Sequence, residues 1–134
     1  MSKTETGTKT KGATRADADH LVFAMAELDE LRIGVDYSST RGSVVEGDRM
    51  MVGLMRIPAG TGAERHSHPN EQWIYVLEGV FHAVVGDQAV EVPAGSVLYI
   101  PSGIVHEGRA GPDRDLVFFT VKDTSHSLHG IKAA

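Results

Sequence analysis

Two histidines, His66 and His68, are the residues of this chain whose spacing is best suited to chemistry. Side chains two positions apart on a β-strand point to the same face of the sheet. Two neutral imidazoles side by side can bind one divalent metal ion, provided that other strands supply further ligands. Farther along, the turn residues Pro101 and Gly103 precede His106, which then stands at the start of a new strand. His106 is therefore the candidate third ligand.

Two neighbouring residues, Glu71 and Gln72, compete for the fourth ligand position. On chemistry alone, the carboxylate of Glu71 is the better ligand for a cation. Strand alternation sends residues 71 and 72 to opposite faces, so only one of them can reach the ion. Gln72 shares its face with Ile74 and Val76, which is the pattern expected of a barrel interior.

The spacing of these residues resembles the two motifs of the cupin family. The first motif is Gly, five residues, His-x-His, three or four residues, Glu, six residues, Gly. The second is Gly, five residues, Pro-x-Gly, two residues, His, three residues, Asn. The matching positions in this chain are Gly60, His66, His68, Gly79, Gly95, Pro101, Gly103 and His106. Gln72 stands where the first motif has Glu, and Ala110 replaces the Asn of the second.

The resemblance implies an all-β fold, a double-stranded β-helix barrel built from two antiparallel sheets like a jelly roll. It also implies one divalent metal ion, held by His66, His68, Gln72 and His106. The count along the first motif falls on Gln72, not on Glu71. Fe, Ni, Zn, Mn and Cu all accept such ligands, so the sequence leaves the identity of the metal open.

Three imidazoles and one amide would leave the +2 charge of the ion uncompensated, so we expect a small, oxygenated, anionic substrate. The segment HSHPNEQWIYVLEG also resembles small cupins that linearise unsaturated uronic acids, and related sugar-acid and dioxygenase cupins. We predict a metal-dependent enzyme with isomerase-like or lyase-like chemistry, in which the ion polarises a carbonyl and stabilises an enolate. A metal-dependent dioxygenase and a non-catalytic ligand-binding cupin are the alternatives. Arg56, His82 and Tyr99 are candidates for pocket residues.

Length and patterning indicate one domain in a chain of 134 residues. We expect residues 20–122 to form it, with a disordered tail over 1–19, which has almost no large apolar side chain to bury, and a loosely held tail over 123–134. Deleting 1–19 should then change stability little. Short apolar runs separated by turn residues predict strands at 49–57, 72–77, 80–85, 89–92, 96–100 and 116–121.

Composition excludes several classes of function. A net charge of −5 without a basic cluster argues against nucleic acid binding. The chain has no cysteine, which excludes disulfides, thiolate ligands and thiol catalysis. No apolar stretch is long enough to span a bilayer and no secretory signal is recognised, so we expect a cytoplasmic protein without a membrane partner. The remaining histidines are expected to be ordinary polar residues: His20, His82, His126 and His129.

The strand predicted at 72–77 is apolar on both faces, because Trp73, Tyr75 and Leu77 alternate with the Gln72 face. A strand of this kind is normally covered on both sides. The N-terminal strands or a second copy of the chain could supply the cover, and we expect a homodimer.

Overall fold

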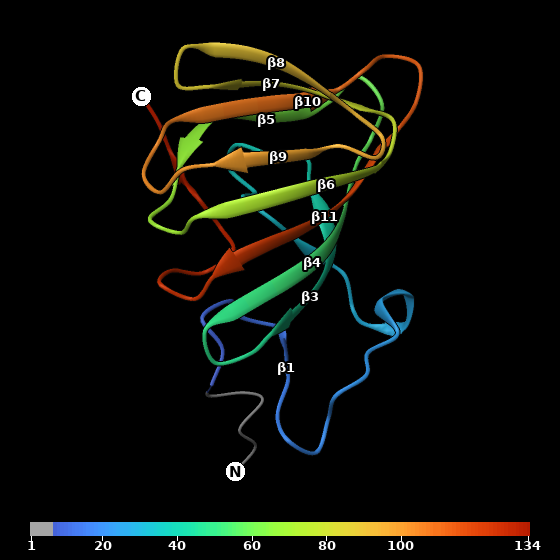
Figure 1. Ribbon diagram of the computed structural model, residues 1–134, viewed down its shortest axis with the longest axis vertical. Helices are drawn as coiled ribbons and strands as arrows, with labels where there is room; N and C mark the ends of the chain where they lie inside the picture. The colour runs from blue at the N-terminus through green and yellow to red at the C-terminus, as the bar shows by residue number, and fades with distance from the viewer. Residues whose placement is uncertain (1–6) are drawn as a thin grey trace.

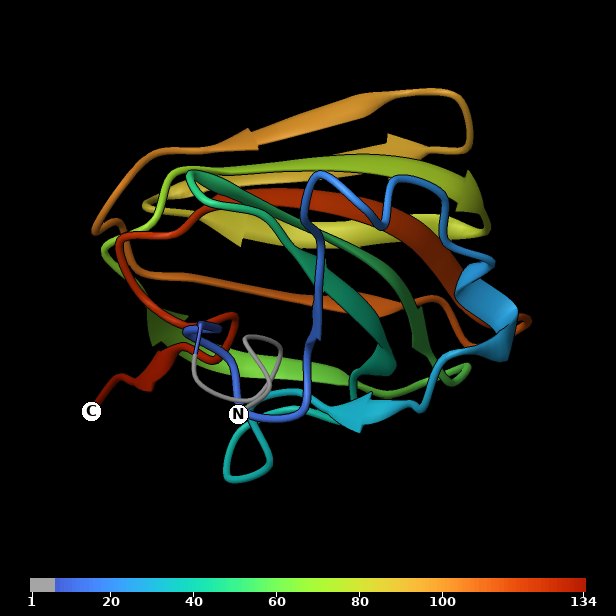
Figure 2. The ribbon, with the colours of Figure 1, turned by 90° about the horizontal axis from the view of Figure 1, so that it is seen from below.

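Two β-sheets enclose one interior in the computed structural model, which describes residues 7–134 (Figures 1 and 2). The first sheet has seven strands in the order β1-β3-β4-β11-β6-β9, with β2 beside β3. Its bounds are β1 Thr14–Arg15, β2 Leu31–Arg32, β3 Arg41–Glu46, β4 Met50–Ile57, β6 Gln72–Glu78, β9 Val97–Ile100 and β11 Leu116–Asp123. The second has the order β12-β5-β10-β7-β8. Its bounds are β5 Gly62–Ser67, β7 Val80–Val85, β8 Gln88–Pro93, β10 His106–Ala110 and β12 Ile131–Lys132.

The pairing is antiparallel apart from the short parallel contact of β1 with β3. The described residues contain no α-helix and one 3₁₀ turn, Met25–Glu27. Alternate residues of the long strands face inward, as the period of two requires. The buried core includes Val44, Met51, Met55, Ile57, Ile74, Val76, Phe81, Ile100, Leu116 and Phe118. The predicted all-β barrel of two sheets is confirmed.

The β7–β8 hairpin turns through only two residues, Gly86 and Asp87, between the paired Val85 and Gln88. Gly86 has a φ of +63°, whereas no non-glycine residue described has a positive φ. A two-residue hairpin turn with positive φ at its first position alone is of type II′, which glycine favours there. This hairpin sets the register of β7 against β8, and β7 pairs on its other side with β10.

The N-terminal segment differs from the predicted disordered tail. Residues 1–6 lie outside the described part, but Thr10 and Ala13 are buried, and Thr14–Arg15 pairs with β3. The reason is Glu46, whose buried carboxylate accepts hydrogen bonds from the backbone N–H groups of Lys9 (2.6 Å) and Thr10 (3.2 Å). The segment is therefore held by hydrogen bonds from its backbone N–H groups, and a hydropathy pattern does not reveal such bonds.

Deleting residues 1–15 should destabilise the barrel, contrary to the sequence-based expectation. The deletion removes both backbone donors of the Glu46 carboxylate and the strand paired with β3, which costs on the order of 3 kcal/mol in free energy of unfolding. Urea unfolding measures the effect. Glu46→Leu is the matched second variant: it should destabilise the full chain, yet restore stability to the shortened one, because no buried charge remains. A shortened chain as stable as the full chain would contradict this assignment.

The C-terminal segment after β11 is also packed, not loose. Leu128 is fully buried, and its N–H donates to the hydroxyl of Thr10 at 2.7 Å. The Asn70 side-chain amide donates to the backbone carbonyls of Asp123 (2.8 Å) and His126 (2.9 Å). Residues 123–132 are thus tied to the N-terminal segment and to the loop before β6.

One outer face of the first sheet is apolar and uncovered in the single chain. Its residues Trp73, Tyr75, Leu77, Val97 and Tyr99 are between 39% and 54% exposed, on β6 and the edge strand β9. The N-terminal strands lie elsewhere, against β3. The homodimer stays a prediction. Sedimentation velocity should give a dimer mass for the native chain and a monomer mass for Trp73→Glu, because a charge cannot be buried unpaired in an apolar interface.

Candidate metal centre

Three histidines from two neighbouring strands meet inside the barrel. His66 lies on β5 and is paired in register with His106, the first residue of β10, while His68 follows directly after β5. The ring centroids of His66 and His106 are 4.2 Å apart, and those of His68 and His106 are 4.8 Å apart. One nitrogen from each ring lies within 4.8 Å of the other two. The predicted convergence of the three histidines is confirmed.

The backbone fixes the tautomer of each ring. The Nδ1 atoms of His66, His68 and His106 lie 2.7, 2.9 and 2.9 Å from the carbonyl oxygens of Glu64, Asn70 and Ile104. A carbonyl oxygen only accepts, so each Nδ1 carries the proton and donates it. Each Nε2 is then left with a free lone pair, which is the arrangement that metal-binding histidines need.

Gln72 begins β6 and places its side-chain oxygen beside this cluster. Its amide nitrogen donates to the hydroxyl of Thr120 at 2.9 Å, and that hydroxyl donates to the carbonyl of Trp73 at 3.0 Å. Because the Thr120 hydrogen is used on Trp73, its oxygen must accept from the amide, which sets the orientation of Gln72. The amide oxygen is consequently turned toward His68, with 3.1 Å between Oε1 and Nε2.

This contact joins two acceptors. Nδ1 of His68 already holds the ring proton, so Nε2 and the Gln72 oxygen both present lone pairs across 3.1 Å. Adding a second proton to the ring is unfavourable, because burial lowers the pKa of His68 to about 4. Burial likewise lowers the pKa of His106 to about 3 and brings that of His66 below its ordinary value. A cation shared by the lone pairs satisfies this arrangement, so the residues fit a divalent metal ion.

The competing residue Glu71 points away from the cluster. Its carboxylate accepts a hydrogen bond from the hydroxyl of Tyr99 at 2.7 Å on the exposed side of the sheet. Among residues 7–134, no Asp or Glu joins the three histidines within ligand distance. Gln72, and not Glu71, therefore lies beside the three histidines, and its role as the fourth ligand stays a prediction.

The sequence-based candidates for pocket residues are not at the site. Arg56 pairs with Asp115 at 3.0 Å, and His82 lies 3.1 Å from Glu91, both on the outside of the barrel. Tyr99 is on the exposed face already described. His20, His126 and His129 also stand outside the cluster. That prediction of pocket residues was wrong because inward and outward strand positions were not assigned along β4, β7 and β9.

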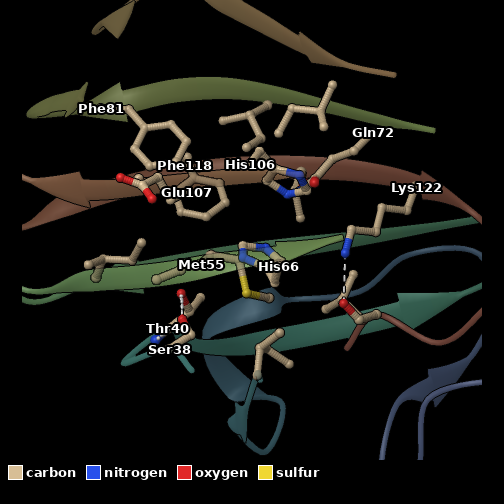
Figure 3. A pocket seen from close by; sticks show the side chains of 18 of the residues that line it. Ser38, Thr40, Met55, His66, Gln72, Phe81, His106, Glu107, Phe118 and Lys122 are labelled. Atoms are coloured by element: carbon tan, nitrogen blue, oxygen red, sulfur yellow. Dashed lines mark hydrogen bonds between the residues drawn. The ribbon is translucent and has the colours of Figure 1, made fainter. Parts of the chain in front are cut away.

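A cavity extends from the histidines between the two sheets (Figure 3). His66, His106, Gln72 and Lys122 lie toward one end of it, and Phe81 and Phe118 toward the other. Its remaining wall is formed mainly by aliphatic side chains, including Met55, Ile57, Ile74, Ile100 and Leu128. A mostly apolar cavity with a few convergent polar groups is the usual form of a small-molecule site.

Sequence reasoning missed three residues at this site. Tyr37 stacks on His66 with ring centroids 4.3 Å apart, and its hydroxyl accepts the N–H of Gly130 at 2.6 Å. Thr120 orients Gln72, and Lys122 lines the cavity. A Cβ atom at Gly130 would lie 2.8 Å from the His66 ring, so only glycine lets the C-terminal segment pass this close. No motif contains these residues, but alternation along β11 would have placed Thr120 and Lys122 on the inner face with Phe118.

A family model described as the cupin domain matches residues 53–122, which is more than half of the chain. The chain belongs to the cupin family. This cupin is 34% identical over 58 residues to an uncharacterized protein of Streptomyces coelicolor, covering 43% of the present chain and 55% of that protein. It therefore spans about half the length of the curated relative it matches.

Solved structures share the fold of this cupin. A cupin-2 domain protein of Rhodospirillum rubrum has a TM-score of 0.71 at 18% identity, covering 85% of this chain and 80% of that one. KdgF from Halomonas sp. has a TM-score of 0.68 at 17% identity, covering 79% of this chain and 94% of that one. At such identities the likeness establishes the barrel alone. Over the residues that the structure describes, this cupin has no helix long and apolar enough to cross a membrane.

Proposed function

We propose that this cupin is a metal-dependent enzyme that binds a small oxo- or hydroxy-carboxylate at one divalent ion and moves a proton next to its carbonyl group. The observation that carries the proposal is the pair of acceptors, His68 Nε2 and Gln72 Oε1, 3.1 Å apart beside two further histidines. The donor set contains no anionic side chain, so an ion held there keeps its double charge and attracts an anionic ligand.

Different groups of residues would have different roles at such a site. His66, His68, His106 and Gln72 would hold the ion, which when bound supplies polarisation of a carbonyl and stabilisation of an enolate. The backbone carbonyls of Glu64, Asn70 and Ile104 hold the rings neutral and correctly turned. The aliphatic wall excludes water, which strengthens electrostatic interactions within the cavity.

Proton exchange tests this function directly. The protein is loaded in turn with Ni²⁺, Zn²⁺, Mn²⁺ or anaerobic Fe²⁺, and short oxo acids in D₂O are followed by NMR while an oxygen electrode records O₂. We expect metal-dependent exchange of the C–H next to the carbonyl without oxygen uptake, abolished by a chelator. Oxygen uptake would overturn the proposal in favour of the dioxygenase. Tight ligand binding with neither exchange nor uptake would replace it with a non-catalytic binding protein.

Gln72→Glu tests the charge argument. The variant replaces a neutral oxygen ligand with a carboxylate of nearly the same shape, so metal affinity should hold or rise. The net charge at the loaded site drops from +2 to +1, and binding of an anionic ligand should weaken by about 1–3 kcal/mol. Calorimetry, first with the metal and then with a hydroxy acid, measures both quantities.

Glu71→Gln is the matched control for that variant. It removes a carboxylate one residue away that faces Tyr99 on the outside of the sheet. Metal and anion affinities should both stay nearly unchanged. Loss of the metal from Glu71→Gln would mean that Glu71 is the fourth ligand and that the neutral donor set is wrong.

A further inference from the structure

Lys122 is a buried amine without an acidic partner. It lies on the inner face of β11, is 5% exposed, and lines the cavity. Its Nζ donates to the backbone carbonyl of Leu128 at 2.7 Å, which uses one of the three N–H donors of an ammonium group. Among residues 7–134, no carboxylate lies within ion-pair distance of Nζ. The adjacent Asp123 instead accepts from the backbone N–H groups of Glu71 and Ser125.

Keeping an unpaired ammonium group buried costs free energy, and burial accordingly lowers the pKa of Lys122 to about 7. A single hydrogen bond to a carbonyl does not require a charge. A neutral side chain could hold Leu128 equally well. The cost is offset when a ligand supplies the missing negative charge inside the cavity, because charge-assisted hydrogen bonds are stronger than neutral ones. Lys122 therefore has the features of a ligand-binding group.

The position of Lys122 relates it to the histidines. In the ladder between β11 and β6, Lys122 is paired with Gln72, and both side chains point inward. Figure 3 shows Lys122 and Gln72 toward the same end of the cavity, with His66 and His106. The wall nearby includes the aliphatic side chains of Ile74 and Leu128. A ligand that meets both the amine and the histidine cluster must be small, with oxygens at two places.

Building on the proposed function, we propose that Lys122 is the second anchor of the substrate. Its ammonium group binds the carboxylate of a short oxo- or hydroxy-carboxylate, whose other oxygen is left for the metal centre. The hydrocarbon part of the ligand lies against the aliphatic wall. Lys122 then selects for a carboxylate over an uncharged group at that end of the ligand.

Calorimetry on the metal-loaded protein tests this role with matched ligands. The probes are 2-oxobutanoate, 3-oxobutanoate and 4-oxopentanoate, each compared with its methyl ester, which lacks the charge. In Lys122→Met, affinity for the best-bound carboxylate should fall by at least about tenfold, whereas affinity for its ester should change by less than about twofold. Equal losses for acid and ester would overturn the role. Lys132→Met, which removes an exposed lysine on β12, is the control and should leave both affinities unchanged.

Three further measurements separate possible failures. Affinity for Zn²⁺ alone should hold or rise in Lys122→Met, because a nearby positive charge is gone; a clear loss would overturn the assignment by making the lysine a support of the metal site. If Lys122→Met does not fold, Lys122→Gln keeps a donor for the Leu128 carbonyl and should show the same selective loss. The metal-free native protein should still prefer acid over ester, and the absence of any preference would contradict the anchor.

A native chain that binds no metal refutes the proposed function itself, whereas metal binding with no effect of Lys122 substitution on ligand affinity refutes only the role of Lys122 as an anchor.

Discussion

His106→Ala should abolish tight binding of a divalent ion. The substitution removes one of the three convergent Nε2 donors and leaves the acceptor pair of His68 and Gln72 with too few partners to hold a cation. Changes to groups that merely support ligands already cost 10- to 100-fold in metal affinity, so loss of a ligand should cost at least about 100-fold. His66→Ala should behave in the same way.

Metal analysis of the purified protein and calorimetry with Ni²⁺ and Zn²⁺ measure this effect. The native chain should bind about one ion, because the donors converge on a single point. His82→Ala is the control, since this exposed histidine faces Glu91 on the outer side of the barrel. Its substitution should leave metal affinity unchanged. Full metal occupancy in His106→Ala would refute the site.

The metal-free protein should lose stability steeply as the pH falls below about 6.5. In the unfolded chain a histidine has a pKa of about 6.5, whereas burial lowers the pKa of His68 to about 4 and that of His106 to about 3 in the folded chain. Between these values the unfolded state binds more protons, so acidification favours it. Each histidine contributes a slope of about 1.4 kcal/mol per pH unit, and the total is on the order of several kcal/mol.

Urea unfolding at pH 7, 6 and 5 checks this dependence. The stability is fully present above the unfolded pKa of about 6.5 and is lost progressively as the pH falls toward the folded values. His106→Leu should flatten the slope, because it removes one of the buried histidines whose pKa is lowered, whereas His82→Gln should leave it unchanged. Saturating metal should oppose the loss, since an ion on the neutral rings stabilises the folded state. A metal-free chain equally stable at pH 7 and pH 5 would contradict the buried, neutral state of the rings.

The sequence was sufficient to predict the barrel and the residues that converge in it, because both depend on short-range spacing. His66 and His68 are two residues apart, and a Pro/Gly turn precedes His106. The hairpin strand β7 was predicted with its observed bounds, Val80–Val85, since glycine turn signals flank it. The position of Gln72 follows from a residue count and agrees with the amide orientation in the structure. Binding of a metal by these residues stays a prediction.

Other features could not be predicted because they depend on long-range register. Strand β3 was not predicted, since Arg41–Glu46 contains only two large apolar residues and owes its place to pairing with β4. The N-terminal segment is fixed by the carboxylate of Glu46, more than thirty residues away. Lys122 belongs to no sequence motif, and only the pairing of β11 with β6 places it beside Gln72.

The hydrogen bonds that orient the four candidate ligands are made entirely within the protein. Each imidazole is held by a carbonyl two residues away in sequence, and Gln72 is held by Thr120. The donors are therefore held close to one another before an ion arrives, so that loading requires only small adjustments of the side chains. In kinetic terms, the rate of metal uptake should then depend on how fast the hydrated ion sheds its water, so ions that exchange water slowly, such as Ni²⁺, should load more slowly than Zn²⁺ even where their final affinities are equal.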